Sequence, residues 1–447
     1  MQQLVNGLKS SASIKVLVIG ALILILLIPV SMIKGVVHDR VRVHNDARLD
    51  IMRSWGGQQL LSGPILVLPY RAVHINKAGN QFVRTDYAYI LPSTLNIDVE
   101  ANPEVLYRGM HKVPIYSANV TLSGTFNSPD FAVLAPVASD VEWHKAFVAL
   151  SVSDARAIAH SPTIDIGGTV SRFKSGGTRI LDKTAPPIVA VIATDLEKYR
   201  QGEALSFAMD LQLKGADSLR FSSLGDTTSV SMNSTWPSPS FVGDYLPEHR
   251  EVTDAGFFAT WQISSLGRAL PSQWVAKAGV SGGACPDSFG VTFYQPVSRY
   301  QLTLRAAKYA VLFIGMSFIA YFLFEVMTEL RLHPLQYLLV GFANALFYLL
   351  LLSLAEHIGF GWAYLLSAAA SISLIAGYSA TVLSGRSRGI TMALVLVALY
   401  AYLYMTLKAE TYALLAGALG LWIMLAIIMF LTRRIDWYAQ GAHAQQD

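Results

Sequence analysis

Three side chains in the second half of the sequence have the spacing of one helical face and could carry a proton or hold a cation. Glu325, Glu329 and His333 follow one another at intervals of four residues, at the end of an apolar segment. Residues four apart lie on one flank of a helix, and a charged group inside lipid is costly enough to suggest a function. Because Arg331 stands among them, we expect Glu329 and His333 to be solvated at the membrane interface. For Glu325 both alternatives stay open, a buried functional carboxylate or a solvated one.

Catalytic motifs are largely missing from the sequence. HExxH, GxxxxGK[ST] and GxGxxG do not occur, and each would be needed for a recognisable metalloprotease, nucleotide or dinucleotide site. Ser379 lies inside an apolar segment, but a serine nucleophile needs a facing base, and no predicted membrane span contains a histidine. The small residues around Ser379 instead favour close packing of helices. We therefore predict that the protein is not an enzyme.

The sequence also lacks the patterns that indicate binding of a metal, a cofactor or a nucleic acid. The single cysteine, Cys285, stands outside any CxxC or histidine-rich stretch. Glu356 and His357 are adjacent, but two residues are too few for a metal site. The net charge of +4 is small and scattered along the chain, unlike the basic patch of a nucleic-acid-binding protein. We predict no metal, no cofactor and no nucleic-acid partner.

Asn344 stands in the middle of the apolar segment LQYLLVGFANALFYLLLLSL. An amide at that depth predicts a hydrogen bond between helices. Ala416 and Gly420 are four residues apart and predict close packing of a further helix. An aromatic belt at the outer membrane interface is predicted from four tyrosines, Tyr400, Tyr402, Tyr404 and Tyr412.

The elements that must position these residues are predicted from the distribution of apolar side chains. Of 447 residues, 53% are hydrophobic and 14% are charged, against about 25% charged in soluble domains. A stretch of about twenty apolar residues spans the hydrocarbon core of a bilayer as a helix. Six such stretches predict one amino-terminal span and a carboxy-terminal bundle of five (residues 305–434): 14–33, 307–327, 335–354, 358–383, 390–407 and 412–431.

The orientation of these spans follows from the basic residues in the short loops. Loops on the cytoplasmic side are enriched in Lys and Arg, and the alternate loops AEHIGF and KAET contain almost none. The two tails, 1–13 and 435–447, are therefore expected in the cytoplasm, with the long polar region on the periplasmic side. The basic residues that set this orientation are Arg331, Arg386, Arg388, Arg433 and Arg434.

Residues 65–304, after a juxtamembrane segment at 34–64, have the pattern of a β-rich domain. Short runs rich in Val, Ile, Thr and aromatic residues recur between Gly, Pro, Asn and Asp, as in ILVLPY, ANVTLSGTF and GVTFYQP. The stretch VTLSGTFNSPDF, from Val120, aligns without gaps to VSMNSTWPSPSF, from Val230. At the same offset of 110, FVA from Phe147 matches FFA from Phe257. We infer two related β units, 65–175 and 176–304.

The stretch TWPSPSFVGDYLP, residues 235–247, admits two interpretations. Proline removes a donor from a strand ladder, so the first is a corner that ends a strand and places an aromatic ring in the core. The second is a loop that contacts a ligand or partner. We favour the corner, because binding loops usually differ between repeats whereas structural corners recur. The candidate contact residues are Trp236, Pro237, Pro239, Phe241 and Asp244.

Three long stretches carry a resemblance to a known family. STWPSPSFVGDYLPEHREVTDAGFFATWQ, LHPLQYLLVGFANALFYLLLLSLAEHIGF and FLTRRIDWYA resemble the CreD family of bacterial inner-membrane proteins, and the resemblance covers nearly the whole chain. It implies a Gram-negative inner-membrane protein produced under a two-component system. It also implies a link to envelope integrity and to tolerance of colicins and other envelope-directed toxins or β-lactams. It supplies no catalytic residues.

These observations lead to two hypotheses on function. In the first, the β domain binds an unidentified periplasmic or envelope partner, and the helices anchor it in the bilayer or transmit its state. In the second, the five-helix bundle is a transporter or flippase with a polar route through it. Transport predicts paired ionisable groups at mid-membrane, and the sequence places only Asn344 there, which favours the first hypothesis. The sequence does not predict an oligomeric state.

Overall fold

The structure is a computed structural model. It describes residues 12–433 except 76–79, 109–110, 131–140, 177–186, 195, 268–269, 276–286, 294–298, 329–331, 384 and 410–411. The chain divides into two compact units. We call Met1–His44 with Val297–Asp447 the helical unit and Asn45–Pro296 the β unit.

The first helix, α2, is longer than the predicted span. It covers Ala12–Ser54 and so contains both the predicted span 14–33 and most of the segment at 34–64. Strand β1 begins at Gln59, before the predicted start of the β domain at residue 65. The apolar run that predicted the span ends at Ile33, but the helix does not. Polar residues can continue a helix outside the membrane, where apolar residues are not needed on all sides.

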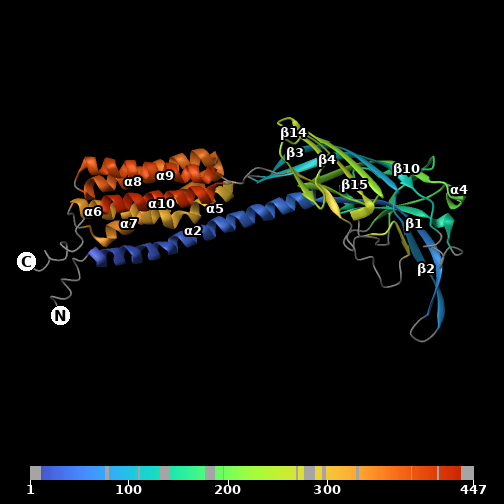
Figure 1. The fold of residues 1–447 in the computed structure, drawn as a ribbon, viewed down its shortest axis with the longest axis horizontal. Helices are drawn as coiled ribbons and strands as arrows, with labels where there is room; N and C mark the ends of the chain where they lie inside the picture. Colours follow the sequence, from blue (N-terminus) through green and yellow to red (C-terminus); the bar gives the residue numbers. More distant parts are fainter. Residues whose placement is uncertain are drawn as a thin grey trace, which may run out of the picture. The chain divides into compact units, whose positions relative to one another are not determined.

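The helical unit contains the carboxy-terminal helices, which Figure 1 shows packed along one another. Leu26 of α2 meets the bundle at Gly341, where a β-carbon would collide with the Leu26 side chain. The buried residues form one apolar cluster that includes Leu26, Phe318 and Phe347. The helices are α5 (Arg299–Lys308), α6 (Ala310–Thr328), α7 (Pro334–Ile358), α8 (Phe360–Val382), α9 (Arg386–Lys408) and α10 (Ala413–Thr432).

Fewer of the described helices than the six predicted are long and apolar enough to be candidate membrane spans. Four of them, α2, α7, α8 and α9, are long and apolar enough to cross a membrane. Helices α5 and α6 make a fifth if they count as one span, which bends by 46° at the break between them. In the described part of α10 the apolar stretch, Leu415–Phe430, is shorter than these. The structure therefore shows four or five candidate spans.

The β unit consists of two sheets. The nine-stranded sheet has the order β13-β17-β11-β1-β5-β9-β8, with β2 paired to β1 and β16 paired to β2. Leu61 to Tyr70 of β1 are buried at every position, as expected for a mostly apolar stretch. The strands of this sheet are β1 (Gln59–Ile75), β2 (Gln81–Ile90), β5 (Phe147–Val152), β8 (Lys174–Ser175), β9 (Ile188–Val191), β11 (Ser218–Ser222), β13 (Pro239–Gly243), β16 (Gln273–Val275) and β17 (Ser288–Phe293).

The eight-stranded sheet has the order β14-β15-β12-β3-β4-β10-β6-β7. Its long strands alternate buried and exposed side chains, most regularly in β10, so one face packs on the core and the other meets solvent. The strands of this sheet are β3 (Thr94–Arg108), β4 (His111–Phe126), β6 (Thr163–Ile166), β7 (Thr169–Arg172), β10 (Leu205–Ala216), β12 (Thr227–Ser234), β14 (His249–Thr253) and β15 (Gly256–Ser264).

The two sheets share one core, which corrects the predicted division at residue 175. Strands from both sides of that position enter each sheet, and a single buried cluster joins them. The matched segments also differ in their pairing: β4 is antiparallel to β3, whereas β12 is parallel to β3. Phe147 lies on β5 in one sheet and Phe257 on β15 in the other. The matched segments are thus not equivalent parts of two superposable units.

Candidate functional site

The Trp-Pro segment connects the two sheets of the β unit. β12 ends at Ser234, and Pro239 begins β13 in the other sheet. Trp236 is half-buried, with its ring edge-on to Phe293 at 6.2 Å between centroids. Pro237 is exposed. In the corner interpretation a proline ends the strand, and for Pro239 this was wrong, because Pro239 begins β13. Its missing N–H is tolerated at the first residue of an edge strand.

Phe241 and Asp244 attach β13 to the rest of the β unit. Phe241 packs edge-on against Phe257 and Trp261, with ring centroids 5.8 and 5.9 Å apart. The backbone N–H of Ser288 donates to Asp244 Oδ2 at 2.9 Å. The backbone N–H of Asp244 donates in turn to the Ser288 carbonyl at 2.9 Å. These contacts show that both residues stabilise the attachment of β13. Their role in contact with a partner remains a prediction.

The structure resolves the two alternatives for the environment of Glu325. Only 3% of this residue is exposed. Its Oε2 accepts a hydrogen bond of 2.7 Å from the Tyr337 hydroxyl of α7, and its Oε1 accepts one of 3.0 Å from the Leu332 N–H. Glu325 is therefore a buried carboxylate that ties the segment before α7 to α6.

His333 does not share a face with Glu325. Helix α6 ends at Thr328, and His333 is the residue that precedes α7. It caps that helix: its Nδ1 accepts from the Leu335 N–H at 3.3 Å, and its own N–H donates to Gln336 Oε1 at 2.9 Å. The helical spacing misled because Pro334 at the start of α7 disfavours helical geometry in the residue before it. Glu329 and Arg331 lie outside the described residues.

Asn344 joins two helices in the middle of the bundle. It is 2% exposed, and its Oδ1 accepts a hydrogen bond of 3.1 Å from the Tyr400 hydroxyl of α9. Its Nδ2 donates to the Val340 carbonyl within α7 at 3.1 Å. The Tyr364 hydroxyl of α8 donates to the Tyr400 carbonyl at 2.6 Å, so the network includes a third helix. The predicted interhelical hydrogen bond of Asn344 is confirmed.

Tyr400 corrects the predicted aromatic belt. It is 4% exposed and lies in the core of the bundle, with its ring 4.7 Å from that of Phe347. Tyr412, by contrast, is well exposed. Spacing alone could not predict the burial of Tyr400, because α9 is largely apolar and its buried face is set by the neighbouring helices.

A GxSxG sequence occurs at residues 385–389, and this pattern can mark a serine nucleophile. That chemistry requires the serine on a sharp turn between a strand and a helix. Here residues 385–389 form the first turn of α9, and the preceding element is another helix, α8. The context is therefore not that of a nucleophile elbow.

The β unit carries one exposed apolar feature that the sequence analysis missed. We call residues 71–75 of β1 and 81–85 of β2 the hairpin arm, which Figure 1 shows projecting beyond the sheets. Val73 and Val83 face each other across the arm, each 65% exposed, and Ile75 is 68% exposed. The alternation of Val73, Ile75 and Val83 around NKAGN was the signal that could have revealed it.

Polar contacts hold the base of the arm. Arg71 and Lys145 both donate to the Glu142 carboxylate, at 3.1 and 3.0 Å. The Lys145 hydrogen bond, together with Arg71, holds the pKa of Glu142 below its ordinary value. His74 Nε2 lies 2.7 Å from Asp86 Oδ2. In the described part of the chain, β1 beyond Tyr70 and β2 before Ala88 pair only with each other.

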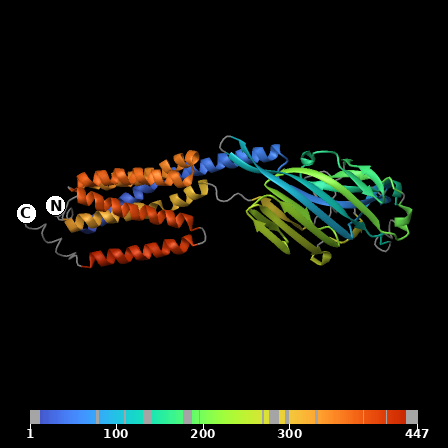
Figure 2. The same cartoon turned by 90° about the horizontal axis from the view of Figure 1, so that it is seen from above.

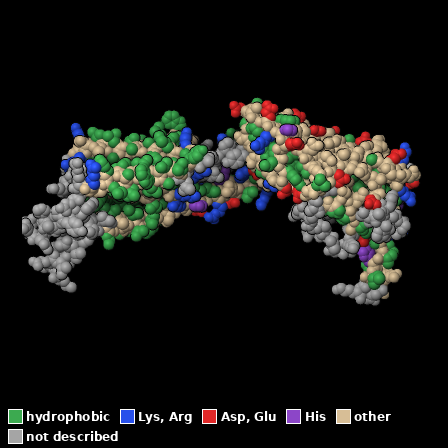
Figure 3. Space-filling view, in the orientation of Figure 1, with side chains coloured by type: hydrophobic (Ala, Val, Ile, Leu, Met, Phe, Trp, Pro, Cys, Tyr) green, Lys and Arg blue, Asp and Glu red, His purple; other side chains and the backbone are tan. Residues whose placement is uncertain are grey.

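Groups of three or more His, Cys, Asp or Glu side chains that could hold a metal ion do not occur among the described residues. Along the helical unit, hydrophobic side chains cover much of the face seen in Figure 3. Leu365, Leu394 and Trp422 are among the large apolar residues that the helices expose. Such a surface is stable in lipid and not in water. The fold thus defines an integral membrane protein with a helical unit and a separate two-sheet β unit.

Comparison with known proteins identifies the family. The family model for the inner membrane protein CreD matches residues 11–438, and the chain belongs to this family. The inner membrane protein CreD of Escherichia coli (strain K12) is 33% identical over 447 residues, which cover 97% of this chain and 95% of that protein. The chain is accordingly an inner-membrane protein with several candidate transmembrane helices.

Two solved structures align with part of the chain. An M1 zinc metallopeptidase from Deinococcus radiodurans aligns with 45% of this chain and 42% of its own chain, with a TM-score of 0.21 and 10% identity. A mutant of that metallopeptidase bound to a Tyr-Ser-Ala substrate gives the same values. Similarity at this level carries no argument about fold or function.

Proposed function

We propose that this protein is a non-enzymatic component of the cell envelope that supports envelope integrity or tolerance of envelope stress. In this proposal the β unit lies in the periplasm and binds a protein partner through the hairpin arm. The exposed apolar side chains of Val73, Ile75 and Val83 are the observation that carries it. Membership of the CreD family supports the setting in the inner membrane.

The arm has the physical properties of a docking element. A two-stranded ribbon is marginally stable by itself in water, and its exposed apolar side chains gain free energy when a partner covers them. Among the described residues its strands also present open edges, to which an extended segment of another protein can add by backbone hydrogen bonds. The partner that fits is a protein with an apolar surface or an unpaired strand.

Substitution of the arm tests this function. The double variant Val73→Asp, Val83→Asp places two charges on the contact surface without touching the core, so we expect normal folding and loss of partner binding. Cells that depend on this variant should survive a β-lactam challenge about tenfold less well or worse, since one desolvated charge at an interface costs several kcal/mol. Survival and the amount of protein in the membrane are the measurements.

The matched control is Val170→Asp on β7, because Val170 is 66% exposed and lies in the other sheet. It should leave survival unchanged. Equal survival of cells carrying the arm variant and the wild type, at equal protein levels, would show that the arm is not the docking element.

The proposed topology has six spans with both termini in the cytoplasm, so that α10 crosses the membrane despite its short apolar stretch. Basic residues at the ends of α9 and α10, Arg386, Arg388 and Arg433, support this orientation. We expect a phosphatase fusion to be active after residue 150 and inactive after residue 440, with a cytoplasmic reporter giving the reverse. An active phosphatase after residue 440 would contradict the topology.

Transport remains the second candidate, because Glu325 and the Asn344–Tyr400 pair are buried polar groups within the bundle. Proton-linked transport needs a carboxylate that changes its protonation state. Both oxygens of Glu325 accept hydrogen bonds from Tyr337 and Leu332, which favours a structural role. The Glu325→Gln variant treated in the Discussion separates the two functions.

A further inference from the structure

The helical unit contains a cavity that the proposed docking function does not use and that is lined by basic side chains. It has a volume of about 500 Å³ and lies between α2 and α5. The parts of α2 and α5 that line it belong to the helical unit, and Figure 2 shows the first part of α2, in blue, beside the carboxy-terminal helices. The described residues that line the cavity are Lys34 and His38 of α2 with Leu304, Arg305 and Lys308 of α5.

The spacing of these residues places the basic groups on two helical faces that meet at the cavity. Lys34 and His38 are four residues apart on α2, and Arg305 and Lys308 are three apart on α5, so each pair lies on one side of its helix. His38 Nδ1 donates a hydrogen bond to the Lys34 carbonyl at 2.7 Å, which orients the ring. None of the described residues that line the cavity is acidic. The lining is therefore positively charged.

Two carboxylates of the neighbouring helices are paired with arginines and do not line the cavity. Asp39 of α2 accepts a hydrogen bond of 2.9 Å from Arg42, and Glu356 near the end of α7 lies 3.7 Å from Arg40. In the part of the chain that the structure describes, none of the basic residues that line the cavity forms a salt bridge. Because like charges repel one another, an anion among them lowers the free energy of this site.

Arg305 gives independent support for an anion. Its Nη1 is buried and donates no hydrogen bond to any residue that the structure describes. A guanidinium carries donors and no acceptor, and buried donors in native proteins are nearly always met by an acceptor. Carboxylates and phosphates accept from arginine through two oxygens at once. The ligand that fits the lining of this cavity is therefore an oxyanion.

Charge and position favour a phosphate over a carboxylate. Lys34, Arg305 and Lys308 offer more positive charge than one carboxylate balances, whereas a phosphate monoester carries about −1.5 to −2 charges at pH 7. The cavity also lies where the apolar runs of two candidate spans end, since Lys34 directly follows Ile33 and α5 directly precedes the apolar helix α6. Lipid phosphates lie at this level of a bilayer, and basic pockets between transmembrane helices bind anionic lipid head groups.

We propose that this cavity binds a phosphate group, carried by a lipid head group or present as inorganic phosphate. Arg305 and Lys308 of α5 and Lys34 of α2 bind the phosphate oxygens, and His38 lies beside them. Because these basic residues come from two helices, a bound phosphate also links α2 to α5.

Binding by the full chain in mild detergent tests this site. The lipid probes are phosphatidic acid and diacylglycerol with identical acyl chains, which differ only in the phosphate, and native mass spectrometry gives their affinities. We expect phosphatidic acid to bind about tenfold more tightly or better. Calorimetric titration of inorganic phosphate into the lipid-free protein distinguishes the two sources. Binding of inorganic phosphate shows that the free ion is sufficient, whereas binding of phosphatidic acid alone identifies a lipid head group.

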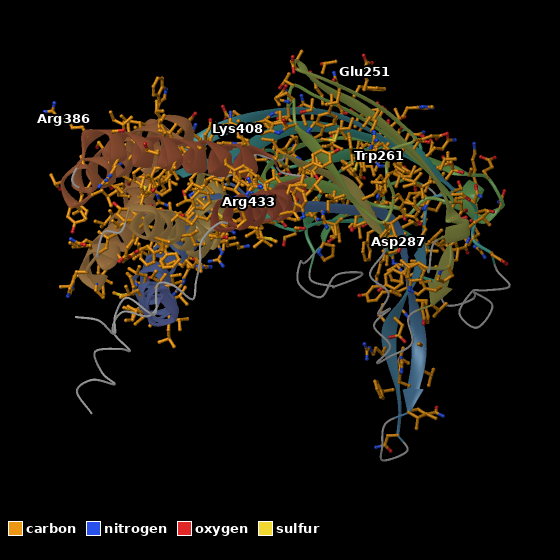
Figure 4. All side chains as sticks on the ribbon, turned by 60° about the vertical axis from the view of Figure 1, so that its left-hand side comes forward. Glu251, Trp261, Asp287, Arg386, Lys408 and Arg433 are labelled. Carbon is orange, nitrogen blue, oxygen red and sulfur yellow. The ribbon has the colours of Figure 1, made fainter. Side chains whose placement is uncertain are left out.

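Variants of the lining locate the phosphate. Arg305→Gln, and separately Lys34→Gln with Lys308→Gln, should each weaken phosphate binding about tenfold or more and leave the affinity for diacylglycerol unchanged. Lys408→Gln is the matched control, because Lys408, labelled in Figure 4, is an exposed basic residue at the end of α9 that does not line the cavity. It should bind as wild type, and the thermal midpoint of each variant without ligand shows whether it is folded. The proposal is overturned if the wild type binds the two lipids equally and no inorganic phosphate, or if the folded lining variants bind as wild type.

Discussion

Replacement of Trp261 by alanine is expected to lower the free energy of unfolding of the β unit by about 3–5 kcal/mol, the range for deletion of a large aromatic side chain from a core. Trp261 on β15 is 2% exposed. Its ring contacts Phe241 and Phe289 from the other sheet, at 5.9 and 5.8 Å between centroids. Loss of the ring therefore removes packing between the two sheets.

Comparing the loss of unfolding free energy for Trp236→Ala with that for Trp261→Ala tests which of the two tryptophans belongs to the core. Trp236 is half-buried, so Trp236→Ala should cost less, roughly 1–2 kcal/mol. Phe258→Ala, also on β15 but at a position that is 44% exposed, is the matched control and should cost less than about 1 kcal/mol. Pulse proteolysis of the full chain in mild detergent with increasing urea gives the three values. An equal loss for Trp236→Ala and Trp261→Ala would contradict this assignment.

Glu325→Leu is the substitution with the second large expected effect. It removes the acceptor of both the Tyr337 hydroxyl and the Leu332 N–H. A donor left without its acceptor costs about 1–3 kcal/mol, so for the two donors we expect a total loss of roughly 2–6 kcal/mol. The thermal midpoint of the full chain in mild detergent, followed by loss of monodisperse protein, should fall clearly below that of the wild type.

Glu325→Gln is the informative partner of this variant, because its amide oxygen can accept from the Leu332 N–H while its amide N–H donates to the hydroxyl oxygen of Tyr337. If Glu325 is structural, Glu325→Gln keeps both the thermal midpoint and the survival of cells under β-lactam challenge. If the carboxylate takes up and releases a proton in transport, the variant keeps its stability and loses its function. That second outcome would favour the transporter over the docking protein.

Much of the membrane architecture could be predicted from the sequence, because hydrophobic length is a local property. A run such as 335–354 has enough apolar residues to cross the bilayer wherever it is placed, and α7 covers it. The β-rich nature of residues 65–304 could equally be predicted from the short strand-like runs. The depth of Asn344 in its run was also sufficient to predict a hydrogen bond to another helix, which Tyr400 provides.

The candidate site depended on contacts that local patterns do not contain. Glu325 and His333 have helical spacing, but the end of α6 at Thr328 separates them and leaves Glu325 facing Tyr337. Tyr400 and Tyr412 have the same residue type, yet packing buries the first and leaves the second exposed. In an apolar helix, only the neighbouring helices determine which face is covered.

The sequence by itself determined which segments form long apolar helices and which region forms strands, since both follow from the number and period of apolar residues along the chain. Only the tertiary structure decided which strands pair. A similar strand can lie antiparallel to β3, as β4 does, or parallel to it, as β12 does. The reason is physical: strand pairing is set by backbone hydrogen bonds and by the burial of side chains on distant strands, and neither is encoded in the strand's own alternation.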